Sequence, residues 1–161
     1  MKIKLWLGTF GLALSLLVQP SSAGQYEDGT AAYHHKDYQT ALKLWQPLAE
    51  QGDAKAQYNL GVLDAKGRGV PKNYTKAVKW FLKAATQGYA KAQYNLGVMY
   101  QKGLGVTKDY VQAYMWFQLA AVKGDGNAVK SLDKLSKLMT PSQIIKAKKL
   151  ANEWVALHPK Q

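Results

Sequence analysis

The chain contains no cysteine. This absence excludes disulfide bonds, thiol catalysis and thiolate metal ligands together, so stability must come from packing and hydrogen bonds. Acidic residues are also scarce, because 10 Asp and Glu stand against 22 Lys and Arg, which gives a formal net charge of +12. Such an excess of positive charge favours anionic partners but carries no information about the fold.

Long hydrophobic runs are absent except at the N-terminus. There, a basic tetrapeptide precedes an apolar stretch from Leu5 to Val18, and Ser21 and Ala23 supply small residues for a cleavage site. This order is typical of a signal peptide, predicted for residues 1–23 with cleavage after Ala23. The alternative, an uncleaved membrane anchor, needs about 20 apolar residues, which is more than the run provides. We therefore expect a periplasmic or secreted mature protein with a net charge of about +10.

A 36-residue period dominates the rest of the sequence. Residues 53–88 and 89–124 are identical at 21 of 36 positions when they are aligned without gaps. Self-similarity at a fixed period of about 20 to 50 residues predicts a stacked repeat architecture. The repeat boundaries then define the organisation of the whole mature chain.

Each repeat carries the signals of two helices. Apolar residues recur three and four positions apart, as in Ala56, Leu60 and Leu63, which places them on one helical face. A pair of glycines separates the two helices, and a short polar residue suitable for an N-cap precedes the second helix: Asp37, Asn73 and Asp109. Each repeat is therefore predicted to be a helix-turn-helix hairpin.

The two flanking segments are variants of this unit. Residues 24–52 keep the second half of the repeat but have a shorter first half, which predicts a tighter turn. Residues 125–161 keep only a skeleton, and Thr140-Pro141-Ser142-Gln143 predicts the start of a capped final helix. A stack of repeats needs an atypical end unit with a polar outer face, and this segment provides one. The expected fold class is all-α, with about eight helices.

The pattern A-x-A-Q-Y-N-L-G-V, followed by G-x-G-V and a closing A-A-x-x-G, resembles the Sel-one-like repeat. This family is related to the tetratricopeptide repeat, and the first repeat, at 24–52, is closer to that form. The resemblance implies a right-handed α-α superhelix, or solenoid, whose first helices line a concave, protein-binding surface. It also implies a role as an envelope scaffold or adaptor. One cysteine-rich branch of the family is associated with β-lactam hydrolysis, and this chain lacks the cysteines of that branch.

A candidate partner-binding surface follows from helical geometry. At about 100° per residue, the first helix of each full repeat turns five residues to the side opposite its leucines. Lysine, tyrosine, asparagine and valine side chains would form two parallel stripes that suit an extended or acidic segment. The alternatives are that the lysines are merely solvated and that Tyr58 and Tyr94 pack between repeats. The predicted site residues are Lys55, Tyr58, Asn59, Val62, Lys66, Lys91, Tyr94, Asn95, Val98 and Lys102.

The rest of the sequence gives only weak signals for a catalytic or metal-binding site. Neighbouring His34 and His35 point about 100° apart on a helix and lack a third ligand, so no metal site is predicted. The carboxylates are scattered, which gives no acid/base pair. A basic end, with lysines at 130, 134, 137, 146, 148 and 149, could meet an anionic surface or simply keep the last unit soluble.

The sequence thus predicts an exported, non-catalytic scaffold that binds another protein, with no cofactor, no metal and no nucleic acid. Two alternatives stay open. One is a hydrolase acting on β-lactams or cell-wall material, and the other is a basic module that docks on anionic envelope surfaces. Membrane association would be peripheral at most, and the oligomeric state is left open.

Overall fold

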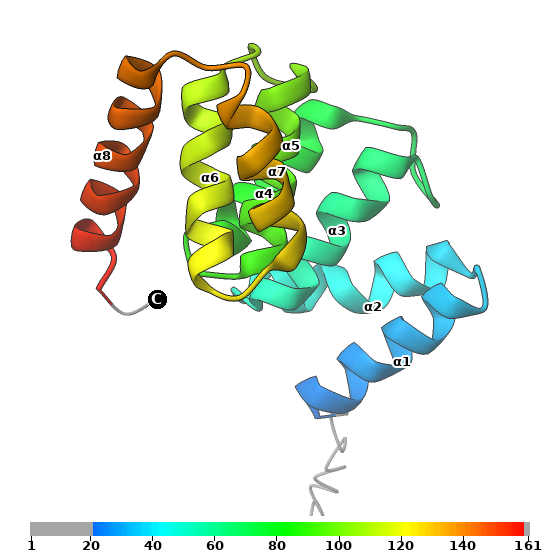
Figure 1. The fold of residues 1–161 in the computed structure, drawn as a ribbon. Coiled ribbons are helices and arrows are strands. Elements are labelled where there is room, and N and C mark those ends of the chain that lie inside the picture. The colour runs from blue at the N-terminus through cyan, green and yellow to red at the C-terminus, as the bar shows by residue number, and fades with distance from the viewer. Residues whose placement is uncertain (1–20, 160–161) are drawn as a thin grey trace, which may run out of the picture.

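The computed structural model describes residues 21–159, so the predicted signal peptide lies outside the described residues except for its last three positions. Eight helices make up this part of the chain, and they stack into a curved solenoid (Figure 1). The predicted all-α superhelix of helical repeats is confirmed. The helices are α1 (Ser22–His34), α2 (Tyr38–Glu50), α3 (Ala54–Lys66), α4 (Tyr74–Ala85), α5 (Ala90–Lys102), α6 (Tyr110–Val122), α7 (Gly126–Ser136) and α8 (Pro141–Leu157).

The first six helices form three hairpins, in which α1 packs on α2, α3 on α4 and α5 on α6. The predicted N-caps are in place: the Asp37 and Asn73 side chains accept from the Thr40 and Lys76 amides at 3.1 and 2.8 Å. Asp109 likewise accepts from two amides of α6. These caps satisfy amides that the first turn of a helix leaves without partners, which fixes where each second helix begins.

The turn within the first hairpin is tight, as the sequence predicted. Three residues separate α1 from α2, whereas seven separate α3 from α4 and α5 from α6. The longer loops reach back to the preceding repeat: Gly69 lies against Tyr38, and Gly105 lies against the backbone of Tyr74. The loops therefore join neighbouring repeats as well as the two helices of one repeat.

One packing motif occurs in every hairpin. A glycine in the first helix admits an aromatic ring from the second, pairing Gly29 with Trp45, Gly61 with Phe81 and Gly97 with Phe117. A tyrosine three residues before each glycine packs on the same ring, with centroid separations of 6.2, 5.8 and 5.6 Å. Close helix approach at a small residue, filled by a ring, gives the core its density.

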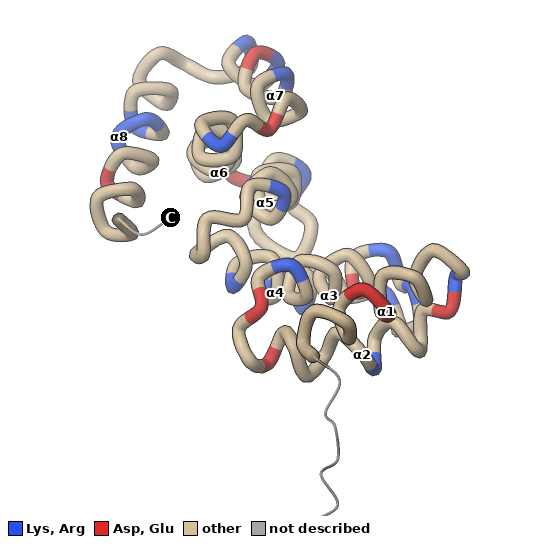
Figure 2. Tube along the Cα trace, turned by 90° about the horizontal axis from the view of Figure 1, so that it is seen from below, with Lys and Arg blue, Asp and Glu red and all other residues tan. Residues whose placement is uncertain are grey.

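The C-terminal unit differs from the three hairpins, because α7 and α8 both pack against α6. Figures 1 and 2 show α6 lying between the two. The α6 positions equivalent to the exposed Lys79 and Lys83 of α4 are Met115 and Leu119, which are buried. The apolar face that replaces these lysines is covered by α8. The capping box of Thr140 and Gln143, with Pro141 at the first helical position, starts α8 as predicted.

A buried carboxylate lies in the second hairpin. Asp64 is 3% exposed, and its Oδ1 atom lies 3.5 Å from the Lys76 Nζ atom. Burial raises the pKa of the Asp64 carboxyl, and the attraction of Lys76 only partly opposes this effect. The equivalent residue in the next repeat is Tyr100. Burying the charged Asp64 side chain therefore costs free energy, at a position where the next repeat has an aromatic residue.

This cost predicts that Asp64→Asn stabilises the fold, by an amount that depends on pH. The folded state holds the Asp64 proton more tightly than the unfolded chain, so the contribution of Asp64 to stability falls as the pH rises through its raised folded pKa. The variant should melt at a higher temperature than the wild type at pH 7, and this difference should shrink near pH 4. Melting followed by circular dichroism measures both. Asp133→Asn, at an exposed ion pair, is the control, and a less stable Asp64→Asn protein at pH 7 would contradict the assignment.

Candidate functional site: a groove lined by the first helices

A groove of about 350 Å³ opens where α1, α3 and α5 come together. We call it the α1–α3 groove. Its walls combine aromatic rings with amide, hydroxyl and amine groups. Five lining residues belong to the predicted stripes: Tyr58, Asn59, Val62, Lys66 and Asn95. The remaining lining residues are Tyr26, Thr30, Tyr33, His34 and Trp45.

The α1 side of the groove was missed by the sequence prediction. Tyr26 and Gly29 repeat Tyr58 and Gly61 at an offset of 32 residues, four fewer than the period, because the first turn is shorter. At this offset, Thr30 and His34 take the places of Val62 and Lys66, and all of them line the groove. The shared Tyr-x-x-Gly spacing was the signal that could have revealed the third stripe.

Hydrogen bonds and charge contacts fix several of these side chains. The Asn59 Nδ2 atom donates to the Tyr26 hydroxyl at 3.2 Å, and the Lys55 amine lies 5.8 Å from the centroid of the same ring. Burial raises the pKa of the Tyr58 phenol, while a hydrogen bond with Asn95 acts in the opposite direction. Tyr58 therefore stays a neutral phenol at physiological pH and offers a hydroxyl rather than a charge.

Four of the ten predicted residues do not face away from the core. Tyr58 and Val62 are half-buried, and the Tyr58 ring packs against Phe81 and Tyr89 with centroids 5.8 and 5.3 Å away. Tyr94 and Val98 pack in the same way around Phe117. The expectation of fully outward stripes is wrong for these residues, because the tyrosines pack on an aromatic ring from the second helix of their own hairpin and the valines lie in the same clusters. The alternative of packing between repeats holds for Tyr58, which also contacts Tyr89 of the next repeat, whereas the Tyr94 ring packs on Phe117 of its own repeat.

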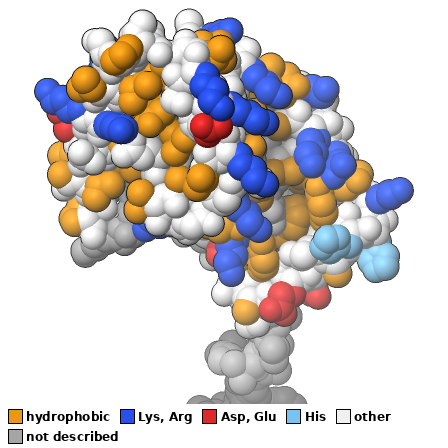
Figure 3. Space-filling view, in the orientation of Figure 1, with side chains coloured by type: hydrophobic (Ala, Val, Ile, Leu, Met, Phe, Trp, Pro, Cys, Tyr) orange, Lys and Arg blue, Asp and Glu red, His pale blue; other side chains and the backbone are white. Residues whose placement is uncertain are grey.

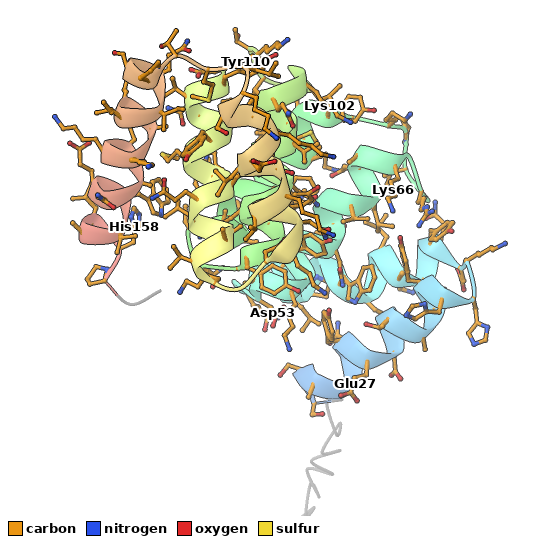
Figure 4. The ribbon with its side chains drawn as sticks, in the orientation of Figure 1. Glu27, Asp53, Lys66, Lys102, Tyr110 and His158 are labelled. Carbon is orange, nitrogen blue, oxygen red and sulfur yellow. The ribbon has the colours of Figure 1, made fainter. Side chains whose placement is uncertain are left out.

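The lysines of the stripes behave differently. Lys55, Lys66, Lys91 and Lys102 are exposed, and only Lys66 lines the groove. Figure 4 shows Lys66 and Lys102 on the same side of the molecule, with Glu27 and Asp53 nearer its lower end. Tyr94, Val98, Lys91 and Lys102 thus lie outside the groove that Tyr58 and Asn95 share.

Most acidic side chains of the described residues are engaged in helix caps or ion pairs. Four aspartates cap helix N-termini, at 37, 53, 109 and 125, and three further acids pair with lysines, at 64, 133 and 153. Figure 3 shows lysine and arginine side chains spread over the face from α7 to α3, with hydrophobic side chains between them. Exposed charges of both signs flank the groove, with Lys66 on its wall and Glu27 and Asp28 on α1.

Side chains that could bind a metal ion are not clustered in the part of the chain that the structure describes. Between Ser21 and Pro159, no group of three or more His, Asp or Glu side chains is placed to hold a metal ion. His34 lines the groove, whereas His35 does not. The eight described helices also include none with the length and hydropathy of a membrane span. The chemistry available in the groove is hydrogen bonding, ring stacking and charge attraction.

Comparison with known proteins agrees with this architecture. A family model of the Sel1 repeat matches residues 23–53, 54–89 and 90–125. A crystal structure of a protective antigen from uropathogenic Escherichia coli strains, which displays an SLR fold, is similar with a TM-score of 0.82 and 30% identity. That likeness covers 87% of this chain and 31% of the antigen.

A second solved structure, a Sel1 repeat protein from Oxalobacter formigenes, is similar with a TM-score of 0.68 and 34% identity. It is matched over 80% of this chain and 55% of its own chain, so this chain spans roughly a third to a half of the two structures. Proteins built from these repeats are typically non-catalytic scaffolds for protein–protein interaction. With three matched repeats and an all-helical stack that aligns with both structures, the chain belongs to the Sel1 repeat family.

Proposed function

We propose that the protein is an exported, non-catalytic scaffold of the bacterial cell envelope that binds an extended acidic segment of another protein in the α1–α3 groove. The observation that carries this proposal is the groove itself, which gathers aromatic rings, two asparagines and a lysine from three successive first helices. Asparagine side chains can pair with the backbone of an extended peptide, and tyrosines offer contact area at a low entropic cost.

The mechanism is preorganisation. Tyr26 is held by Trp45 and Asn59, and Tyr58 is held by Phe81 and Tyr89, before any partner arrives. Little side-chain freedom is then lost on binding, so more of the contact energy contributes to affinity. The lysines around the groove would raise the association rate with an acidic segment and make this rate sensitive to salt.

A charge-reversal pair tests the proposal. Lys66→Glu places a negative charge at the wall of the groove, and Lys79→Glu makes the same change in net charge on the exposed face of α4. We expect Lys66→Glu to weaken capture of the partner from envelope extracts by about tenfold or more. Lys79→Glu should stay within about twofold of the wild type. A photoreactive group at residue 95 identifies the partner.

Three results would argue against this proposal: two indicate another function, and one indicates another binding surface. Equal weakening by both variants, with binding to anionic vesicles, would indicate a basic docking module. Turnover of a chromogenic β-lactam or a peptidoglycan fragment by the purified chain would indicate a hydrolase. Full binding by Lys66→Glu would place the partner elsewhere on the surface. Tyr58→Ala is a poorer probe, because it also removes packing against Phe81 and Tyr89.

A further inference from the structure

A second, smaller pocket lies at the opposite side of the third repeat, where the ends of α6 and α8 meet α5. We call it the α6–α8 pocket; its volume is about 160 Å³. Its walls are Gln93 from α5, Leu119 and Val122 from α6 and Val155 from α8, with Lys123 just after α6 and His158 and Pro159 just after α8. The preceding repeat has Lys83 and Thr86 in place of Leu119 and Val122. The apolar walls therefore belong to the third repeat alone.

The side-chain oxygen of a buried glutamine in this pocket lacks a hydrogen-bond partner among the described residues. In the preceding repeat, Gln57 donates to the Ala49 carbonyl, and its Oε1 atom accepts from the Gln87 amide at 2.9 Å. Gln93 occupies the same position and donates to the Ala85 carbonyl at 3.2 Å. Among residues 21–159 its Oε1 atom has no hydrogen-bond partner, although Gln93 is only 1% exposed. The difference arises because Lys123 stands where the repeat has Gln87.

An unpartnered acceptor at 1% exposure is costly, so the site favours an occupant that brings a donor. The charge at the mouth is positive. Lys123 is exposed and forms no ion pair among residues 21–159, and no carboxylate lines the pocket. His158 donates through Nδ1 to the Trp154 carbonyl at 2.8 Å and stacks on the Trp154 ring. The pocket thus combines an acceptor, an apolar wall and a cation.

The volume of the pocket limits the size of the molecule that it can bind. A protein cavity of about 150 Å³ holds a molecule the size of benzene. A pocket of 160 Å³ therefore accepts one aliphatic or small aromatic side chain rather than a drug-sized ligand. A group that joins such a side chain to an N–H donor and a carboxylate is the last residue of a peptide chain.

We propose that the α6–α8 pocket binds the apolar carboxy-terminal residue of a peptide. The terminal amide N–H would donate to the Gln93 Oε1 atom, the side chain would contact Leu119 and Val155, and the carboxylate would lie beside the Lys123 amine. This site is independent of the α1–α3 groove, and its test does not rest on the function proposed for that groove.

The test uses N-acetyl-leucine and the mature chain, followed by NMR. We expect shifts of the Gln93 side-chain amide and of the Trp154 indole N–H, with a dissociation constant of about 1 mM for such a small ligand. N-acetyl-leucinamide lacks the carboxylate and should bind about tenfold more weakly. A pentapeptide that ends in leucine should bind at least as well as N-acetyl-leucine. Equal binding of free leucine would overturn the assignment to a peptide end.

Lys123→Gln is the decisive variant, because it restores the residue that partners Gln57 in the preceding repeat. The new amide can donate to the Gln93 Oε1 atom, and the substitution also removes the cation. Binding of N-acetyl-leucine should therefore weaken at least about tenfold. Lys79→Gln makes the same charge change on α4 and should bind as the wild type does. Shifts that persist in Lys123→Gln, or no shifts in the wild type, would overturn the proposal and leave Gln93 bonded to water only.

Discussion

Replacing Gly105 by alanine is expected to lower the free energy of unfolding by about 3 kcal/mol or more. Gly105 has a φ of +71°, a conformation that costs an L-residue about 1–2 kcal/mol. A Cβ atom there would lie 2.4 Å from the Tyr74 carbonyl carbon and 2.6 Å from the Thr75 nitrogen. Both atoms are backbone, so a helix must move, and overpacking of this kind costs about 1–3 kcal/mol more. Chemical denaturation of the purified protein measures the change.

Gly124→Ala separates the two causes. Gly124 has a φ of +89°, but a Cβ atom there meets no other atom within 4 Å. This variant should lose only the backbone contribution, about 1 kcal/mol. Equal losses at Gly105 and Gly124 would show that the loop does not press on the preceding repeat.

Phe117→Ala is expected to cost about 3–5 kcal/mol, a large part of the roughly 5–15 kcal/mol that stabilises an ordinary domain. The ring is fully buried, and it fills the space left by Gly97. A Cβ atom at Gly97 would lie 2.4 Å from the Phe117 Cδ1 atom. Gly97→Ala should therefore destabilise the wild type. In the Phe117→Ala background the clash is gone, and alanine should stabilise the helix by up to about 1 kcal/mol.

This reversal of sign is measured by a double-mutant cycle with chemical denaturation. Gly61→Ala is the matched control, because its Cβ atom would meet Phe81 rather than Phe117. Its effect should be the same in both backgrounds to within about 0.5 kcal/mol. A Gly97→Ala change that destabilises both backgrounds equally would contradict the pairing of glycine and ring.

The sequence was sufficient for the fold because the repeat signals are local. The period, the capping residues Asp37, Asn73 and Asp109, and the glycine loops each depend on neighbouring residues, and the structure places them as predicted. The packing of α8 against α6 was harder to predict from the sequence. Its signal was the change from Lys79 and Lys83 to Met115 and Leu119, which is readable only once the two repeats are compared position by position.

The candidate site was predicted in part, because a helical wheel treats each helix in isolation. Asn59 and Lys66 of the predicted stripes line the groove, but a wheel could not show that Tyr58 packs on Tyr89 or that Tyr94 packs on Phe117. The contribution of α1 depends on curvature and on the shortened first turn, which shifts its register by four residues. The unpartnered side-chain oxygen of Gln93 results from the way three helices pack together among the described residues, so sequence alone gives no sign of it.

The position of α8 also determines where such a chain can grow longer. Because α8 covers the apolar face formed by Met115 and Leu119, the repeat that contains α6 must remain next to α8. Copies of residues 53–88 carry lysines on the corresponding face and are compatible with open solvent there. Lengthening by duplication is therefore tolerated upstream of the third repeat, while the C-terminal end stays constant.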